Sequence, residues 1–384
     1  MTTDLAFNRV EIDLAALKAN YRLLKDSGQG RPLMAVVKGD AYGHGLLACA
    51  QSLVAAGAND LGVLDVLEGL ALKKILPATV NIYVLAGLLS REQILAALNN
   101  QLVMVVYSAA QLKLILDLIP PGGLGRAYLK IDTGMGRLGL STPEAMNLLP
   151  LIVKNDRLVI MGLMTHLATA GDYFATAQLN RFQGLIDLDQ KIHLTQGRHS
   201  ALAGPGFLSY PNYVDQLSRV GLLLYGANPL SDSLDRIAND RLAVVQSLQP
   251  VMSFSSQIIQ IRTVKAKESL SYDRTFVAPT DLKVAAAPVG YVHGLNRSRS
   301  NRGYALINGQ KARLLGRVCM NLCLFDVSEI PNARVGQKVV LLGRAGSAQI
   351  QVEELAAWQG TNAYETLCLI GRLNPRSFIN DKSD

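Results

Sequence analysis

The first residue that could do chemistry is Lys38, which ends the apolar run Leu33-Met34-Ala35-Val36-Val37. The run is too short for a helix and rich in valine, which predicts a strand buried on both faces. A glycine-rich stretch, residues 39–45, follows the lysine. We therefore expect Lys38 at the mouth of the strand, with its stem packed and its amine in a cleft, rather than a lysine that merely reaches out to solvent. Burial disfavours the ammonium, so the amine would shift towards its neutral, nucleophilic form.

Three further side chains that could do chemistry, those of Arg137, His166 and Arg219, lie near other apolar runs. Arg137 lies in Lys130-Ile-Asp-Thr-Gly-Met-Gly-Arg137-Leu-Gly139, where the glycines leave the backbone open to a ligand and the arginine supplies a planar cation. His166 comes directly after a predicted strand, and Arg219 precedes Val220 and Gly221. Each has a structural alternative: a surface loop, a hydrogen-bonded core histidine, or an arginine paired with a carboxylate.

The elements that would position these residues alternate between short apolar runs and helical stretches. Asp13 is the predicted N-cap of a helix that stops at Gly28, and residues 108–118 and 173–188 have helical periodicity. Besides the strand that ends on Lys38, strands are predicted at 61–64, 82–85, 103–106, 127–131, 158–164, 192–195 and 221–224. This alternation predicts a (β/α)8 TIM barrel, in which catalytic groups lie at the C-terminal ends of strands. Lys38, Arg137 and His166 all lie at or just past such an end.

The pattern changes from about Leu242 onwards. Predicted strands now follow one another with few helices between them, at 253–264, 283–289, 304–307, 311–318 and 339–342. Asn308-Gly309 predicts a hairpin turn that needs positive φ at both central residues. Helices are expected from Val352 and from Thr361. We therefore predict a barrel domain, 1–241, and a mostly β domain, 242–384.

Composition excludes several classes of function. The 384 residues are enough for two domains, and the net charge of +8 would suit a phosphorylated cofactor or an anionic substrate. The positive residues are scattered rather than clustered with aromatics, which argues against nucleic-acid binding. Neither a membrane span nor a signal-peptide pattern is recognisable, so we expect a cytoplasmic protein without a membrane partner. The four cysteines form no CxxC pair and, with the five histidines, no metal-ligand spacing, which predicts free thiols and no metal.

The segment Ala35-Val-Val-Lys38-Gly-Asp-Ala-Tyr42-Gly-His-Gly45 resembles the pyridoxal-phosphate signature of the alanine racemases. The stretch 130–139 resembles their second signature, and the resemblance extends in order from Glu11 to about Arg376. It implies a fold-type III pyridoxal 5'-phosphate enzyme, an isomerase that interconverts L-alanine and D-alanine and supplies D-alanine for peptidoglycan. Lys38 would bind the cofactor covalently and act as the base on the face seen by D-alanine.

The resemblance also implies roles for other residues. Arg137 would contact the cofactor and the substrate carboxylate, and would be held in place by Lys130, a lysine that is often carbamylated in the family. His166 would form a hydrogen-bonded line with Arg219 and the catalytic tyrosine. Arg219 would face the ring nitrogen of the cofactor, as a guanidinium that keeps its proton. The remaining cofactor-binding residues would be Tyr42, Gly204, Gly221, Leu222 and Tyr364.

The second base implied by the resemblance is Tyr272. The segment Ser271-Tyr272-Asp273-Arg274 resembles a Gly-Tyr-Gly-Arg segment whose tyrosine reaches the lysine of the other subunit. This implies a homodimer with active sites shared across the interface. Tyr291 and Met320 would line the substrate entrance.

Three positions depart from the family pattern. Gly204 stands where a phosphate-binding serine is usual, and His293 and Asn321 replace aspartates. These changes leave open a racemase of broader specificity, for example one that also acts on serine. A non-catalytic carrier of pyridoxal phosphate is a second alternative, but it gives Tyr272 no role. A decarboxylase of the same architecture is disfavoured, because Arg219 would oppose the strong electron sink that decarboxylation needs.

Overall fold

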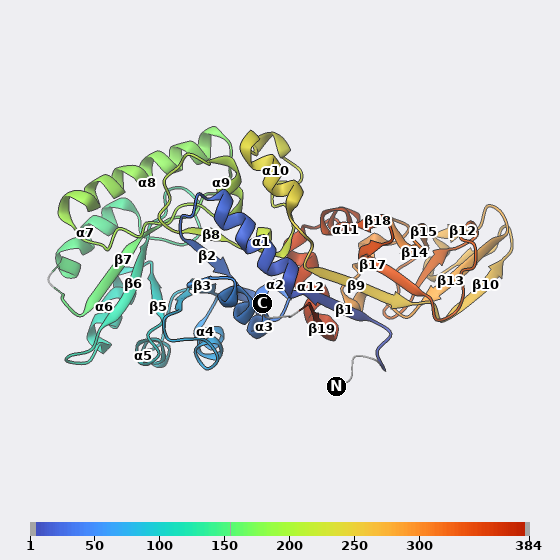
Figure 1. Cartoon of the computed structure of the whole chain (residues 1–384), viewed down its shortest axis with the longest axis horizontal. Coiled ribbons are helices and arrows are strands. Elements are labelled where there is room, and N and C mark those ends of the chain that lie inside the picture. Colours follow the sequence, from blue (N-terminus) through green and yellow to red (C-terminus); the bar gives the residue numbers. More distant parts are fainter. Residues whose placement is uncertain (1–4, 154, 381–384) are drawn as a thin grey trace.

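The molecule has two lobes arranged along its long axis. The computed structural model describes residues 5–153 and 155–380. Figure 1 shows one lobe in which helices surround strands and a second lobe built mostly from strands. The predicted fold class, a barrel followed by a mostly β region, is confirmed.

The first lobe is built on a parallel sheet of seven strands. Their order in space is β7-β6-β5-β4-β3-β2-β8. The strands are β2 (Leu33–Val36), β3 (Asp60–Val63), β4 (Asn81–Val84), β5 (Val103–Val106), β6 (Gly125–Lys130), β7 (Leu158–Met164) and β8 (Ser218–Val220). Their side chains are almost all buried, as expected for parallel strands covered by helices. Strands β2 to β7 confirm the strands predicted in this part of the sequence.

An eighth segment joins the two ends of this sheet. Ser200 forms a parallel bridge with Met164 at the end of β7, and Ala203 forms one with Arg219 on β8. The backbone N–H of Thr165 donates to the carbonyl of Ser200 at 2.9 Å, and that of Arg219 donates to Leu202 at 2.9 Å. The segment thus takes the place of the seventh barrel strand and closes the barrel.

Two predicted strands are wrong. Residues 192–195 are not a strand, because the helix α8 (Tyr173–Ile192) runs up to them and ends at His193, whose φ is 49°. Residues 221–224 are not a strand either: β8 stops at Val220, and the 3-10 helix η2 (Leu222–Tyr225) follows. The second error arises because a short apolar run alone does not distinguish a strand from a buried helical turn. The first arises because Ile192 and Leu194 alternate with polar residues, as in a half-buried strand.

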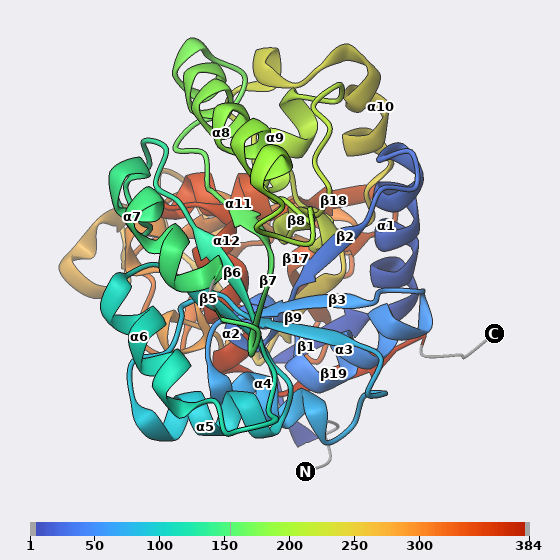
Figure 2. The same cartoon turned by 90° about the vertical axis from the view of Figure 1, so that its left-hand side faces the viewer.

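The barrel helices lie outside the strands, as Figure 2 shows in the view along the long axis. Asp13 caps the first of them by accepting a hydrogen bond from the N–H of Ala16 at 2.9 Å, which confirms the predicted N-cap. The predicted helix at 108–118 is also confirmed, with Ser108 as its N-cap. Besides α8, these helices are α1 (Leu14–Ser27), α3 (Leu46–Ala55), α4 (Val66–Lys73), α5 (Arg91–Asn99), α6 (Ala109–Leu118), α7 (Thr142–Val153) and α9 (Gly204–Ser209). The short segment α2 (Lys38–Tyr42) directly follows β2 and has a left-handed backbone.

The second lobe contains a larger sheet and a small two-stranded one. The path of the large sheet is β10-β13-β16-β15-β14-β17-β9-β1-β19, with β18 on β17, and β11 pairs with β12. The strands are β1 (Arg9–Asp13), β9 (Met252–Gln257), β10 (Gln260–Val264), β11 (Ser269–Leu270), β12 (Phe276–Val277), β13 (Leu282–Ala287), β14 (Tyr304–Ile307), β15 (Gln310–Leu315), β16 (Cys323–Asp326), β17 (Lys338–Ala345), β18 (Ala348–Ile350) and β19 (Arg376–Ile379).

Most predictions for this lobe are confirmed. The hairpin between β14 and β15 has φ of 52° at Asn308 and 74° at Gly309, as its turn requires. The predicted strand 253–264 is in fact two strands, β9 and β10, which pair with different neighbours. Helices α11 (Val352–Gln359) and α12 (Ala363–Leu373) accompany the sheets, whereas α10 (Asn239–Ser247) packs on the barrel, where Arg241 donates to the carbonyl of Ser27.

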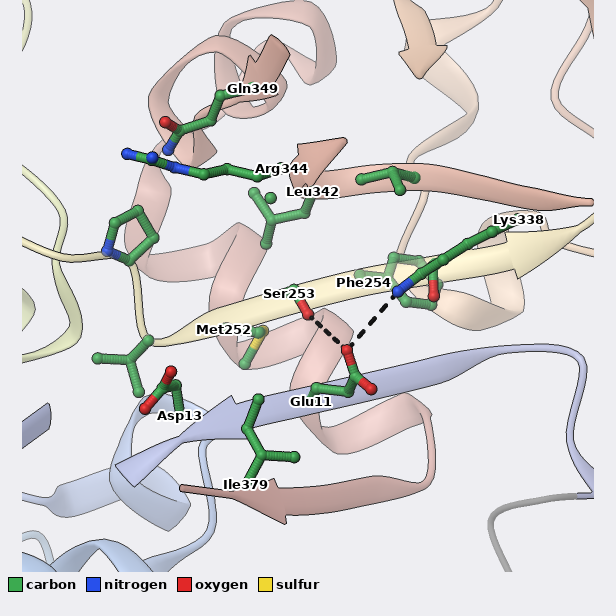
Figure 3. Close-up of a pocket in the computed structure, with 15 residues that line it drawn as sticks. Glu11, Asp13, Met252, Ser253, Phe254, Lys338, Leu342, Arg344, Gln349 and Ile379 are labelled. Carbon is green, nitrogen blue, oxygen red and sulfur yellow. Dashed lines mark hydrogen bonds and ion pairs between the residues drawn. The ribbon is translucent and has the colours of Figure 1, made fainter. Parts of the chain in front are cut away.

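Strand β1 connects the two lobes in an unexpected way. It precedes the barrel in sequence but lies in the large sheet of the second lobe, antiparallel to β9 and parallel to β19. Figure 3 shows a pocket beside these strands, where Lys338 Nζ lies 3.7 Å from the carboxylate of Glu11 on β1. The boundary near residue 241 therefore stays a prediction, since the second sheet also includes residues from before the barrel.

Candidate active site

Lys38 follows β2 in a turn of unusual backbone conformation. The φ angles of Gly39, Asp40, Ala41 and Tyr42 are 64°, 57°, 54° and 54°, all in the left-handed region. For residues with a Cβ this conformation costs about 1–2 kcal/mol each. The turn is closed by the N–H of Ala41, which donates to the carbonyl of Val37 at 2.8 Å. Its effect is to place Lys38 and Tyr42 at the C-terminal end of a barrel strand.

The surroundings of Lys38 make its amine less basic. Burial is the largest cause of its lowered pKa, and the positive charges of Arg137 and Arg219 add to it. Glu68 and Cys368 act in the opposite direction. The lowering of the Lys38 pKa by burial agrees with the prediction made from the sequence. No local pattern predicts a role for Glu68, whose carboxylate accepts hydrogen bonds from the N–H groups of Asp40 and Leu64, at 3.0 and 2.8 Å.

The loop after β6 positions Arg137. The carboxylate of Asp132 accepts hydrogen bonds from the N–H groups of Gly134 and Arg137, at 2.8 and 3.1 Å. Gly139 has a φ of 146°, and a Cβ there would lie 2.5 Å from the backbone nitrogen of Asp132, so only glycine fits. Gly139, one of the glycines predicted to open the loop after β6, therefore also lets the end of that loop approach the backbone of Asp132.

Lys130 is the last residue of β6 and is buried. Burial and the charges of Arg219 and Arg137 lower its pKa to about 7. The charge of Asp132 opposes this shift. A large fraction of the Lys130 amine is therefore neutral near pH 7.

His166 and Arg219 are in contact, as the resemblance implied. Arg219 Nη2 lies 3.2 Å from His166 Nδ1 and donates to the carbonyl of Thr165 at 2.7 Å, while Nη1 donates to the carbonyl of Ser200 at 3.0 Å. Burial, followed by the charges of Arg219 and Lys130, lowers the pKa of His166 to about 2. The ring is therefore neutral, and it meets a guanidinium that is fixed by backbone carbonyls of two neighbouring barrel segments.

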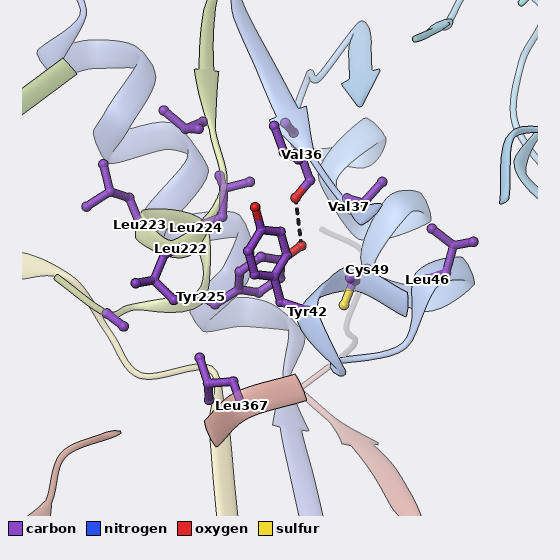
Figure 4. Packing of buried hydrophobic residues seen from close by; sticks show 14 of the residues in the cluster. Val36, Val37, Tyr42, Leu46, Cys49, Leu222, Leu223, Leu224, Tyr225 and Leu367 are labelled. Atoms are coloured by element: carbon purple, nitrogen blue, oxygen red, sulfur yellow. Dashed lines mark hydrogen bonds between the residues drawn. The ribbon is translucent and has the colours of Figure 1, made fainter. Parts of the chain in front are cut away.

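The Tyr42 ring, at the end of the lysine turn, packs against two other tyrosine rings. The ring of Tyr42 lies 5.1 Å from that of Tyr225 and 5.9 Å from that of Tyr364. Figure 4 shows Tyr42 beside Tyr225 and η2, with the Tyr225 hydroxyl bonded to the carbonyl of Val36 at 3.1 Å. A Cβ on Gly221 would lie 2.4 Å from the Tyr42 oxygen, so glycine lets the backbone approach this hydroxyl. Tyr225, to which we assigned no role from the sequence, thus supports the predicted cofactor residue Tyr42.

Gly204 begins the short helix α9 and follows the bridge at Ala203. Its φ is not in the left-handed region, and a Cβ there would meet Leu223 Cδ1 at 3.5 Å, an ordinary contact. A residue with a side chain would therefore fit at this position. The glycine is not required by the backbone.

The residues at this barrel mouth fit a phosphorylated aldehyde. Lys38 offers an amine of lowered pKa, and Arg137 and Arg219 are close enough to affect it electrostatically. The approach of the Gly221 backbone to the Tyr42 hydroxyl forms a cradle that a Cβ would fill. Groups of three or more histidine, cysteine, aspartate or glutamate residues that could hold a metal ion are not found among residues 5–153 and 155–380.

Tyr364 of α12 joins this group through its contact with Tyr42, but the predicted residues Tyr272, Tyr291 and Met320 do not. Tyr272 begins the short 3-10 helix η4 (Tyr272–Arg274) between β11 and β12, and is 67% exposed. Figure 1 places β12 at the end of the second lobe far from β2. Tyr291 and Met320 are also in the second lobe and are 40% and 53% exposed. One chain alone therefore brings together Lys38, Arg137, His166 and Arg219, but not Tyr272.

Comparison with known proteins agrees with this arrangement along the whole chain. The family described as "Alanine racemase, N-terminal domain" matches residues 12–229, and "Alanine racemase, C-terminal domain" matches residues 251–378. The alanine racemase of Syntrophobacter fumaroxidans is 36% identical over 382 residues, covering 98% of each chain.

Solved structures show the same similarity. Alanine racemase from Streptomyces coelicolor superposes with a TM-score of 0.90 at 30% identity, covering 97% of this chain and 98% of that one. The alanine racemase from Bartonella henselae, solved with covalently bound pyridoxal phosphate, gives 0.84 at 26% identity, covering 97% and 100%. The chain belongs to the alanine racemase family and is an isomerase.

Proposed function

We propose that this chain interconverts L-alanine and D-alanine with pyridoxal 5'-phosphate bound at Lys38. The observation that carries the proposal is the Lys38 amine, made less basic by burial and by Arg137 and Arg219 at the barrel mouth. The proposal also rests on family membership over the full length of the chain.

Each residue of the site has its own role in binding or proton transfer. When bound, pyridoxal phosphate withdraws electrons from the Cα–H bond of an amino acid. Lys38 holds the cofactor and then takes or returns the Cα proton on one face of the substrate. Arg137 binds the substrate carboxylate, and Arg219 keeps its charge on the cofactor side of the site. Tyr42, Tyr364 and the backbone of Gly204, Gly221 and Leu222 hold the phosphate.

The second base is Tyr272 of a second copy of the chain. Inversion of Cα needs a proton acceptor on each face, and within one chain Tyr272 lies in the far part of the other lobe. A homodimer in which the second lobe of one chain meets the barrel mouth of the other would bring Tyr272, Tyr291 and Met320 to Lys38. Their exposed side chains are available for such an interface.

The cellular role that follows is the supply of D-alanine for peptidoglycan by a cytoplasmic enzyme. All four cysteines are free thiols, which is typical of a reducing compartment. Helices long and apolar enough to cross a membrane are not found in the described part of the chain.

The test is incubation of the purified holoenzyme with L-alanine in deuterated buffer. We expect D-alanine to appear with deuterium at Cα, and Lys38→Ala to abolish both this exchange and the visible absorbance of bound cofactor. A cofactor band without Cα exchange would instead support a non-catalytic carrier. Faster exchange with L-serine than with L-alanine would support the broader-specificity racemase, and would tie the departures at Asn321 and His293 to substrate choice.

A further inference from the structure

The left-handed turn after Lys38 needs external support. Its residues Asp40, Ala41 and Tyr42 carry side chains in a conformation that such residues rarely adopt. Backbone of this kind persists only where surrounding contacts hold it. The contacts that hold it therefore decide where Lys38 and Tyr42 lie.

The side chain of Asp40 makes the central contact. One carboxylate oxygen, Oδ1, accepts a hydrogen bond from the N–H of Leu46 at 2.7 Å. The other, Oδ2, forms an ion pair with Nη1 of Arg376. The same Nη1 donates to the carbonyl of Gly43 at 2.8 Å. Arg376 thus binds both the side chain and the backbone of the turn.

The partner of Asp40 comes from the other lobe. Arg376 is the first residue of β19, where it pairs with Val10 of β1 in the large sheet. It is 336 residues away from Asp40 in sequence. Both side chains are only partly exposed, at 25% and 35%, so water screens their attraction less than on an open surface.

The segment that carries Arg376 also packs tightly against the turn. A Cβ on Gly371 of α12 would lie 2.0 Å from the carbonyl oxygen of Gly43. A Cβ on Gly45 would lie 2.8 Å from the ring of Phe378 on β19. These close backbone approaches place α12 and β19 directly against the turn and leave the guanidinium of Arg376 little freedom.

We propose that Arg376 and Asp40 are positioning residues, and that their ion pair lets the last strand of the second lobe hold the strained turn that presents Lys38 and Tyr42. This inference rests on the proposed function only in the catalytic and cofactor-binding roles given to Lys38 and Tyr42. It gives a role in the site to β19, a strand of the large sheet that lies outside the barrel.

The first test is hydrogen–deuterium exchange in the cofactor-free protein, followed by mass spectrometry. In Arg376→Gln we expect amides of residues 40–46 to exchange at least about tenfold faster, because the turn opens locally, while peptides from β5 and β6 are unchanged. Arg376→Lys should restore most of the protection, since it keeps the charge. Lys338→Gln is the matched control: it removes the ion pair to Glu11 in the same sheet without touching the turn.

A second readout reports on Lys38 itself. Burial is the main cause of its lowered pKa, so loosening of the turn should move the pH profile of Lys38 acetylation in the cofactor-free protein to higher pH. A purely structural role for Arg376 would lower overall stability without this movement. With cofactor bound, we expect kcat to fall more than KM changes, because Lys38 is displaced while the rest of the alanine site remains.

The outcomes separate the inference from the proposed function. Unchanged exchange in residues 40–46 and an unmoved Lys38 profile in Arg376→Gln would overturn the inference, even if the wild type racemises alanine. The exchange result in the cofactor-free protein would stand even if the wild type did not racemise alanine. Should Arg376→Gln fold poorly, Asp40→Asn removes the same ion pair and keeps Oδ1 as an acceptor for Leu46. The same loosening is then expected, and its absence would refute the proposal.

Discussion

At the scale of single residues, the site is defined by basic groups that lower one another's basicity. Arg219 is held by backbone carbonyls, and its charge lowers the pKa of Lys38, Lys130 and His166. Burial is a separate and larger cause of each lowered pKa, because the charged forms lose water. The site therefore combines two amines of lowered pKa and a neutral imidazole with guanidinium groups.

Lys130 provides a prediction about pH. Because its folded pKa is lowered to about 7, the ammonium is lost as pH rises through 7, and the neutral amine can then react with carbon dioxide. A carbamate there would place a negative charge between Arg137 and Arg219. With ¹³C-labelled bicarbonate we expect a carbamate NMR signal that grows as pH rises through about 7 and is absent in Lys130→Met. A signal that is absent at alkaline pH would show that Lys130 stays unmodified.

Gly204 provides a prediction about cofactor affinity. A Cβ fits there at 3.5 Å from Leu223, so Gly204→Ser should add a hydroxyl to the cradle without strain. One hydrogen bond to a charged group contributes roughly 1–2 kcal/mol, so we expect Kd for pyridoxal phosphate to fall by about tenfold. Equilibrium dialysis measures this, and Gly204→Ala, which adds the Cβ alone, is the control. Equal affinities for the serine and alanine variants would contradict a phosphate contact at this position.

At the scale of elements, the success of prediction followed the strength of the local signal. The strands β3 to β7 were predictable because buried parallel strands give short, continuous apolar runs. The segment around Ser200 was not, because it pairs through isolated bridges and residues 200–203 include no β-branched or aromatic residue. Residues 221–224 were mistaken for a strand because they form an apolar run, and residues 192–195 because apolar and polar residues alternate there.

The same contrast applies to the site. Lys38, Arg137 and His166 could be placed at strand ends from the sequence, because each follows an apolar run. The role of Glu68 and the Asp40–Arg376 ion pair could not, since the latter joins residues far apart in sequence. The left-handed turn at residues 39–42 could not be predicted either, because only one of its four residues is glycine.

The packing of α12 on the lysine turn leads to a stability prediction. In Gly371→Ala the new methyl would meet the carbonyl of Gly43, a backbone atom that cannot move aside cheaply. We expect a loss of about 1–3 kcal/mol in the free energy of unfolding, measured by urea denaturation. Gly184→Ala in α8 is the matched control, because a Cβ there meets nothing within 4 Å and should stabilise by roughly 0.5–1 kcal/mol. Equal stabilities would mean that α12 can shift away from the turn.

At the scale of the whole molecule, the two lobes keep the proposed bases apart. Tyr272 lies beyond β11 in the second lobe, and Lys38 lies in the barrel. An active site with both bases would therefore need two chains. This could be proposed from the resemblance but not from composition or periodicity, which describe only one chain.

Mixed dimers test this arrangement. Lys38→Ala and Tyr272→Phe should each be nearly inactive alone, and Tyr272→Phe should slow the L-to-D direction most under single-turnover conditions. In a mixed dimer one site carries both changes and the other carries neither. After unfolding and refolding of an equal mixture, random pairing should restore about a quarter of wild-type activity. If the two bases belonged to the same chain, mixing would restore nothing.

The place of β1 has a consequence for synthesis of the protein on the ribosome. This strand emerges before the barrel, but its neighbours β9 and β19 are translated only after the barrel is complete. During most of translation β1 has no sheet to join, and the nascent lysine turn has no Arg376. A growing chain thus acquires its reactive lysine early, and the ion pair that holds the lysine turn forms only after the final strand is made.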